Sequence, residues 1–169
     1  MNFQFYKEKL FASKEFEGFK KEFPDAFFTS GFFSIDKEQK EQDQFHLDFF
    51  IPSAKKLFSF KLEVGIEKLP IEIIEGQEFE KISDGINFDF DEIEKLIQKE
   101  MDSQGVKNKI QKLIYSLQGK GGREFLIVTV FISGFGILKV NIDIGEKKII
   151  SFEKKSFMDF LKVGGKKKD

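Results

Sequence analysis

The segment EFLIVTVFISGFGILKVNIDIG, residues 124–145, constrains the fold more than any other part of the chain. In residues 137–144 apolar and polar residues alternate, which is typical of an antiparallel strand with one face in solvent. In residues 125–132 apolar residues occupy both alternating positions, so this strand is predicted to be central and buried on both faces. A helix would cover one face. The second cover could be another helix, the sheet of the other half, an identical subunit or a ligand, and cover from within the chain is favoured.

Composition excludes several kinds of chemistry. The chain has 169 residues, enough for one ordinary domain or two very small ones. It has no cysteine, which excludes disulfides, thiol catalysis and cysteine-ligated metal centres. Its 28 basic and 29 acidic residues nearly cancel, and Arg123 is the only arginine, so we predict no nucleic-acid partner. Phenylalanine, with 24 residues, predicts a core filled by aromatic rings.

The ends of the chain bear on its location. The start, MNFQFYKEKL, lacks the basic flank and apolar block of a secretory signal, and no stretch approaches about 18 consecutive apolar residues. We therefore predict a cytoplasmic protein without a transmembrane segment.

Near the other end, Phe157, Phe160 and Leu161 precede three lysines, which would allow peripheral contact with an anionic membrane. A single short helix is a weak anchor, so a helix that covers the sheet is favoured.

Local patterns predict the smaller elements. Apolar residues at helical spacing predict a helix from about Lys7 to Phe23, which Pro24 ends. Ser156 is predicted to cap a short final helix. The predicted strands cover residues 26–36, 45–51, 58–64, 69–74, 124–133, 137–144 and 147–152.

A longer helix is predicted in the middle of the chain. Asp89, with Glu92 three residues later, resembles a capping box at its start. The apolar stripe resumes after a predicted break at residues 103–105 and ends at the glycines between 119 and 122. This helix is expected to cover the sheet through Ile93, Leu96, Ile97, Ile110, Leu113 and Leu117.

These elements predict an α+β fold in which antiparallel β-meanders pack against helices, as two similar helix-plus-meander halves or as one continuous sheet. A shift of 80 residues aligns residues 45–69 with residues 125–149 without a gap. Two unrelated pairs of strands that alternate apolar and polar residues would match equally well, so a repeat and a chance match both stay open. The predicted organisation is a helix and meander in residues 1–76, then a capped helix, meander and short helix in residues 77–163. A frayed basic tail is predicted for residues 164–169.

In about residues 90–153 a helix precedes a meander whose middle strand ends at Asp143, and a glycine turn follows at Gly145. This pattern resembles PepSY-type, cystatin-like domains. The resemblance implies a binding or regulatory module, in some cases linked to control of peptidases, without catalytic residues of its own. Such domains are often exported or tethered to membranes, whereas this chain shows no export signal.

No residue is assigned a catalytic, cofactor-binding or metal-binding role, and no cofactor is predicted. His46 is the only histidine, and Asp48 is predicted to share its polar strand face, which is more often solvated surface than a site. Asp89 fits a helix start, where the helix dipole favours negative charge. The glycines between 119 and 122 follow a predicted helix rather than precede one, so a turn explains them better than a phosphate-binding loop.

Three functions remain open from the sequence. The first, our working hypothesis, is a non-catalytic binding or regulatory module, with a homodimer or a protein partner on a sheet face. The second is a carrier or sensor of a small apolar ligand held between the sheet and the long helix. The third is an enzyme that uses carboxylates, which the residue inventory disfavours.

Overall fold

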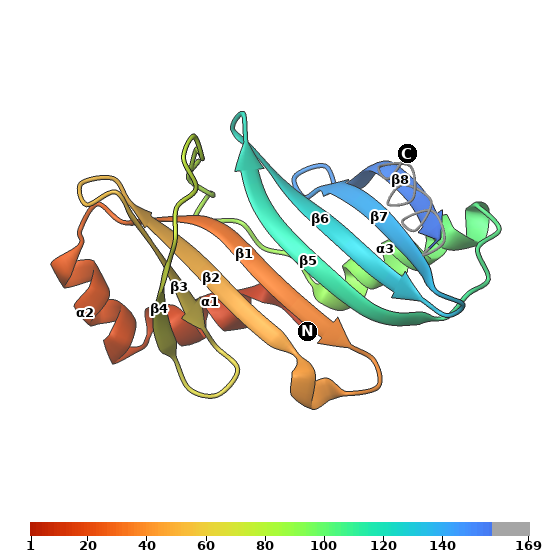
Figure 1. Ribbon diagram of the computed structural model, residues 1–169, viewed down its shortest axis with the longest axis horizontal. Helices are drawn as coiled ribbons and strands as arrows, with labels where there is room; N and C mark the ends of the chain where they lie inside the picture. The colour runs from red at the N-terminus through yellow and green to blue at the C-terminus, as the bar shows by residue number, and fades with distance from the viewer. Residues whose placement is uncertain (157–169) are drawn as a thin grey trace, which may run out of the picture.

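The computed structural model describes residues 1–156, which form one eight-stranded antiparallel sheet and three α-helices (Figure 1). The strand order is β4-β3-β2-β1-β5-β6-β7-β8, so that β1 pairs with β5 in the middle of the sheet. This confirms the predicted α+β class with antiparallel meanders, and the sheet is continuous. The elements are α1 (Phe3–Phe11), α2 (Lys14–Glu22), β1 (Phe27–Asp36), the 3-10 helix η1 (Lys40–Gln42), β2 (Gln44–Ile51), β3 (Lys56–Lys61), β4 (Glu67–Ile71), α3 (Phe90–Ser103), β5 (Ile110–Lys120), β6 (Arg123–Ile132), β7 (Gly136–Asp143) and β8 (Lys148–Ser156).

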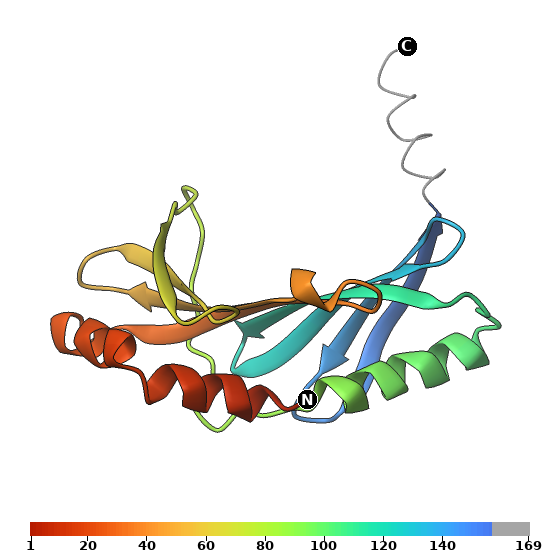
Figure 2. The same ribbon diagram turned by 90° about the horizontal axis from the view of Figure 1, so that it is seen from below.

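The three helices lie on one face of the sheet, which we call the covered face (Figure 2). The opposite face carries no α-helix of residues 1–156, and we call it the open face. The core lies between the helices and the covered face, where residues such as Ile97 of α3 and Val128 of β6 are fully buried. Burial of each such side chain contributes roughly 1.5–3 kcal/mol.

Aromatic rings fill the core beneath the first two helices, as the composition predicted. Phe19 of α2 contacts the rings of Phe49, Phe58 and Phe60 in the sheet, with centroid distances of 6.0, 5.8 and 5.1 Å and edge-on geometry. Edge-on pairs place the positive rim of one ring against the negative face of another, which adds to the gain from burial alone. These contacts attach a short helix firmly to the sheet.

The predicted single helix from Lys7 to Phe23 is wrong, because two helices occupy this segment. The first begins at Phe3, where the side chain of Asn2 accepts a hydrogen bond from the backbone, and it ends at Phe11. Ser13 then caps α2, since its Oγ accepts a hydrogen bond from the backbone N–H of Phe16 at 3.1 Å. A serine side chain that satisfies an otherwise free N–H favours a helix start at that point.

The predicted continuation of the long helix is also wrong. Asp89 is the N-cap as expected, and it accepts hydrogen bonds from the backbone N–H groups of Asp91 and Glu92 at 2.8 and 3.2 Å. However, α3 ends at Ser103, shortly before Gly105 with its φ of 72°, and residues 110–120 form strand β5. From Leu113 to Leu117 the buried residues of this strand are spaced two apart, so this part of the apolar pattern has a strand period that was interpreted as a helical one. An irregularity in the pairing separates Ile110 from Leu113 by three residues.

Two edges of the sheet also differ from the prediction. The strand expected at residues 69–74 is β4, Glu67–Ile71, and β8 continues as far as Ser156. Ser156, which was predicted to cap a final helix, is the last residue of β8, and the cap stays a prediction because the helix would lie outside the described residues. The predicted final helix and basic tail in residues 157–169, together with any membrane contact made by them, lie outside the described residues.

The two halves of the sheet have matching topology, because each is a four-stranded meander with helices on the covered face. The shift of 80 residues places Phe60 of β3 over Val140 of β7, and both are buried on the covered face. The same shift places buried Phe45 over Phe125, which lies on the open face. The ungapped match therefore fails for β2 and β6, although the order of strands repeats.

We expect Tyr115→Phe to leave stability unchanged or to raise it by about 1 kcal/mol. The Tyr115 ring is fully buried and meets Phe90 edge-on, but its hydroxyl has no hydrogen-bond partner within residues 1–156. Burial also raises the pKa of this phenol above its ordinary value. Phenylalanine keeps the ring contact and removes the unsatisfied group. Urea midpoints of the two proteins test this, and a loss above about 1 kcal/mol would reveal a partner for the hydroxyl.

Candidate functional site

The open face carries a group of apolar side chains that strand alternation places there. In β6 the even-numbered residues face the helices, so the odd-numbered residues lie on the open face. Strand pairing then places Ile137 opposite Phe131, and Ile114 diagonally between Ile127 and Phe131. All of these side chains are half-buried. We define the open-face patch as Phe32, Ile114, Phe125, Ile127, Phe131 and Ile137.

The patch changes the interpretation of strand β6, which was predicted to be buried on both faces. Leu126, Val128 and Val130 are fully buried under α3, in agreement with that prediction. The odd-numbered residues Phe125 and Ile127 are only half-buried, and no helix within residues 1–156 lies over them. Over β6 and β7, cover of this face from within the described chain is therefore not observed. Apolar residues on an otherwise uncovered sheet face are typical of a surface that binds another molecule.

Lysines border the patch on its β5, β7 and β8 sides. Lys112 lies opposite Phe131, and Lys155 lies opposite Ile137, so that two cations flank this apolar pair. Lys139 lies two residues along β7 from Ile137, opposite Thr129, and its side chain is exposed. The patch therefore combines an apolar centre with a positive border.

A cleft of about 420 Å³ lies on the open face across β1 and β5 in the middle of the sheet, next to the segment that follows β4, and Phe32 of the patch helps to line it. The ring of Phe79 stacks on Phe50 at 4.4 Å and 15°, and holds this segment against the sheet. Ser30 Oγ donates a hydrogen bond to Asp48 Oδ2 at 2.7 Å on the cleft wall. The cleft thus presents hydroxyl and carboxylate groups, in contrast to the positive border of the patch.

His46 and Asp48 share the open face of β2, as predicted, but the imidazole contacts Glu63 rather than Asp48. Its Nε2 lies 2.8 Å from Oε1 of Glu63, and the same carboxylate oxygen accepts a hydrogen bond from the backbone N–H of Phe45 at 3.0 Å. Glu63 thereby holds the first residues of β2 against the turn after β3.

Within residues 1–156 no group of three or more His, Cys, Asp or Glu side chains is arranged to hold a metal ion.

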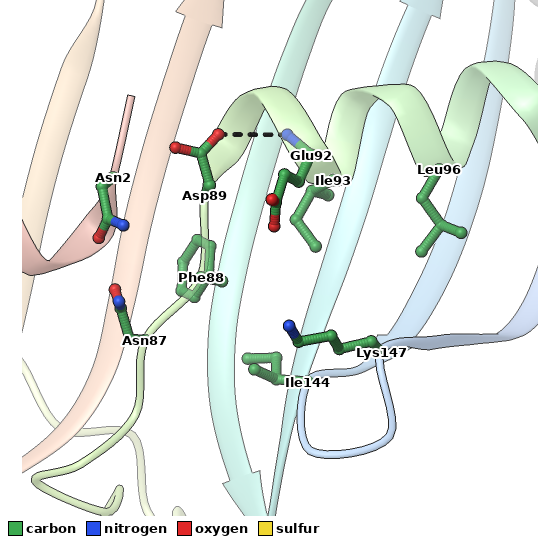
Figure 3. A pocket seen from close by; sticks show the side chains of 9 residues that line it. All are labelled: Asn2, Asn87, Phe88, Asp89, Glu92, Ile93, Leu96, Ile144 and Lys147. Atoms are coloured by element: carbon green, nitrogen blue, oxygen red, sulfur yellow. Dashed lines mark hydrogen bonds between the residues drawn. The ribbon is translucent and has the colours of Figure 1, made fainter.

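A second pocket, of about 360 Å³, lies where the N-terminal ends of α1 and α3 meet (Figure 3). The two helix starts are joined because the N–H of Phe3 donates to the carbonyl of Phe88 and the N–H of Phe90 donates to the carbonyl of Met1, both at 2.9 Å. The Met1 ammonium binds Asp91, which raises the pKa of that amine. Polar side chains form the rim of the pocket around an apolar floor, and its lining consists of Asn2, Asn87, Phe88, Asp89, Glu92, Ile93, Leu96, Ile144 and Lys147.

The remaining candidate residues have structural roles. Asp143 is buried at the end of β7, where its Oδ1 accepts a hydrogen bond from the N–H of Glu146 at 3.0 Å and its Oδ2 lies 2.5 Å from Arg123. It therefore shapes the turn before β8. Gly121 and Gly122 have φ values of 61° and 76° and form the tight turn between β5 and β6, which confirms the predicted turn, although a strand and not a helix precedes it.

Comparisons with known proteins give one similar fold. No known family matches the sequence, and no curated protein matches it either. The structure is similar to the crystal structure of a protein from Clostridium difficile 630 that is named "putative lipoprotein". The two chains share 10% sequence identity and a TM-score of 0.55, over 83% of this chain and 90% of that chain. At this identity the likeness concerns the fold alone.

No helix within residues 1–156 is long and apolar enough to cross a membrane.

Proposed function

We propose that this chain is a non-catalytic binding or regulatory module that recognises a protein partner through the open face of its sheet. The observation that carries the proposal is the open-face patch, six apolar side chains on a rigid sheet face with no helix of residues 1–156 above them. A protein surface can bury apolar side chains of this kind and gain free energy without any catalytic group. The PepSY-type resemblance of the second half supports the same class of function.

The positions of the carboxylates support a binding role over an enzymatic one. Asp89 caps α3, Asp143 shapes the β7–β8 turn with Arg123, and Glu63 joins His46 to the backbone of Phe45. Each of these groups already has a structural partner. A catalytic pair would instead need carboxylates that converge on a cleft without other partners. Asp48, Glu78 and Glu80 line the open-face cleft, and Asp48 accepts a hydrogen bond from Ser30 there.

Photo-crosslinking in cells of the source organism tests this proposal. Benzoylphenylalanine in place of Phe131 puts the reactive group in the open-face patch, and the control carries it in place of Lys99, on the exposed side of α3. We expect one defined protein to be crosslinked at Phe131 and not at Lys99. Crosslinks that form at Lys99 and not at Phe131 would show that the binding surface lies on the helices.

The pocket at the start of α3 favours a small-ligand carrier as the second candidate function. Ile93, Leu96 and Ile144 give it an apolar floor at one end of the interface between α3 and the sheet. Titration with the apolar dye anilinonaphthalene sulfonate tests this candidate. Saturable binding that is lost in Leu96→Trp, a substitution that fills the pocket, would support a carrier. Dye binding that is absent, or that Leu96→Trp leaves unchanged, would contradict it.

A further inference from the structure

The segment that follows β4 forms an acidic projection, which we call the connector arm, residues 72–80. Its sequence EIIEGQEFE contains four glutamates and no basic residue. A turn closes its tip, where the N–H of Gln77 donates to the carbonyl of Ile74 at 3.0 Å. Ile74 is 74% exposed there. The arm therefore presents apolar and negatively charged side chains together, and its four glutamates form no ion pair within the described part of the chain.

The open-face patch has the complementary chemistry. Phe131 and Ile137 offer an apolar surface, and Lys112, Lys139 and Lys155 border it. Lys155 lies 3.6 Å from Glu153, a weak surface pair. Glu153 also lies opposite Lys139 in the strand pairing, although these two residues form no ion pair with each other in the described part of the chain. An apolar centre with a positive border fits an apolar segment that carries glutamates.

The tip of the arm and the part of the patch on β5–β7 lie on the same side of the sheet but in opposite halves. Phe32 is the exception, because it lies on β1 and lines the open-face cleft together with residues 77–80 of the arm. Figure 2 shows the arm rising on the side away from the helices, next to β4 (olive), while the patch belongs to β1 and β5–β7. Because the two sites are separated in one molecule, a two-fold axis through the open face would place each arm on the patch of the other copy. In such an isologous contact the arm of each copy meets the patch of the other, so the same contact forms twice.

We infer that the open face is occupied by a second copy of this chain, with the connector arm of each copy bound to the open-face patch of its partner. This inference rests on the proposed function, since it names the partner of the same face. The dimer would bury the exposed Ile74 against apolar residues and place Glu72 and Glu75 near Lys112 and Lys139. Dimer formation would also control the access of any other protein to the open face.

A charge-exchange experiment tests the dimer. Sedimentation equilibrium at low salt is expected to show a dimer that dissociates as salt rises to about 0.5 M, because salt screens exposed charge pairs. Lys112→Glu/Lys139→Glu should weaken the dimer about tenfold or more, and so should Glu72→Lys/Glu75→Lys. An equimolar mixture of the two variants should form a heterodimer in which both arm–patch contacts join opposite charges, one of them with the two charges exchanged. The matched control, Lys95→Glu/Lys99→Glu on the exposed side of α3, should leave the dimer unchanged.

Three results would overturn the inference. The first is a wild-type protein that is monomeric at about 0.1 mM and low salt, where contacts of micromolar affinity would be saturated. The second is a dimer that the arm and patch variants leave intact. The third is weakening by the α3 control to the same extent, which would indicate a general charge effect. Circular dichroism of each variant establishes that the fold is retained. A monomer that still gives a Phe131 crosslink to a different protein would overturn the dimer and leave the proposed function standing.

Discussion

Val128→Lys is expected to unfold the protein or make it insoluble, whereas Ile127→Lys is expected to leave it folded. Val128 is 0% exposed and lies between Tyr115 of β5 and Val140 of β7 on the covered face. A lysine there would carry a charge without a partner into the core, at a cost of several kcal/mol. That cost approaches the total stability of a typical domain, about 5–15 kcal/mol.

Ile127 is the matched control, because it is the next residue of the same strand. It lies between Ser116 and Asn141 on the open face and is half-buried, so a lysine ammonium can reach solvent there. Urea midpoints and soluble yields of the two variants provide the comparison. If both variants unfold, residues outside the described part cover the open face. If both fold, α3 does not pack on β6 as observed.

Phe90→Ala is expected to cost about 3–5 kcal/mol, the range for truncation of a fully buried aromatic side chain. Phe90 is 1% exposed at the start of α3, and its ring meets Phe33 of β1 and Tyr115 of β5, each at 5.1 Å. It therefore ties the helix of the second half to the central strands of both halves. Its loss would leave a cavity at the middle of the core.

Phe5→Ala provides the control for this truncation. Phe5 lies in α1 and is 61% exposed, although its ring also touches Tyr6 at 5.3 Å. Its loss should cost less than about 1 kcal/mol, because little apolar area leaves water when this ring folds into place. Equal costs for Phe5→Ala and Phe90→Ala in denaturant unfolding would contradict the described position of the core.

Sequence patterns predicted β6 and β7 well, because β7 alternates clearly and a glycine turn precedes it. The Asp89 cap was also predictable, since its side-chain chemistry acts locally. Strand β5 was not, because Ile110, Leu113, Ile114 and Leu117 fit a helical stripe as well as a strand. Pairing with β1 and β6, for example of Phe33 with Tyr115, makes this segment a strand rather than a helix. Because β1 is distant in the sequence, no local pattern reveals this pairing.

The candidate binding surface was partly visible in the sequence. In residues 125–132 apolar residues occupy both the odd and the even positions, which indicated that both faces of this strand are shielded from solvent. The side on which the helices pack, and hence which residues form the open-face patch, follows only from the three-dimensional arrangement. The connector arm was missed for a similar reason. Its glutamates look like ordinary solvated charges until the turn at Ile74 and the stack of Phe79 on Phe50 place them beside the open face.

Single-cysteine labelling along β6 tests the central claim, that one face of the sheet is core and the other a binding surface. The chain has no cysteine, so each of Phe125→Cys, Leu126→Cys, Ile127→Cys and Val128→Cys carries one thiol. In dilute protein, we expect maleimide to label positions 125 and 127 at least about tenfold faster than positions 126 and 128, since reaction at a fully buried thiol requires opening of the core. Labelling at position 127 should slow when a partner occupies the open face. Equal protection of all four thiols in the dilute protein would contradict the claim.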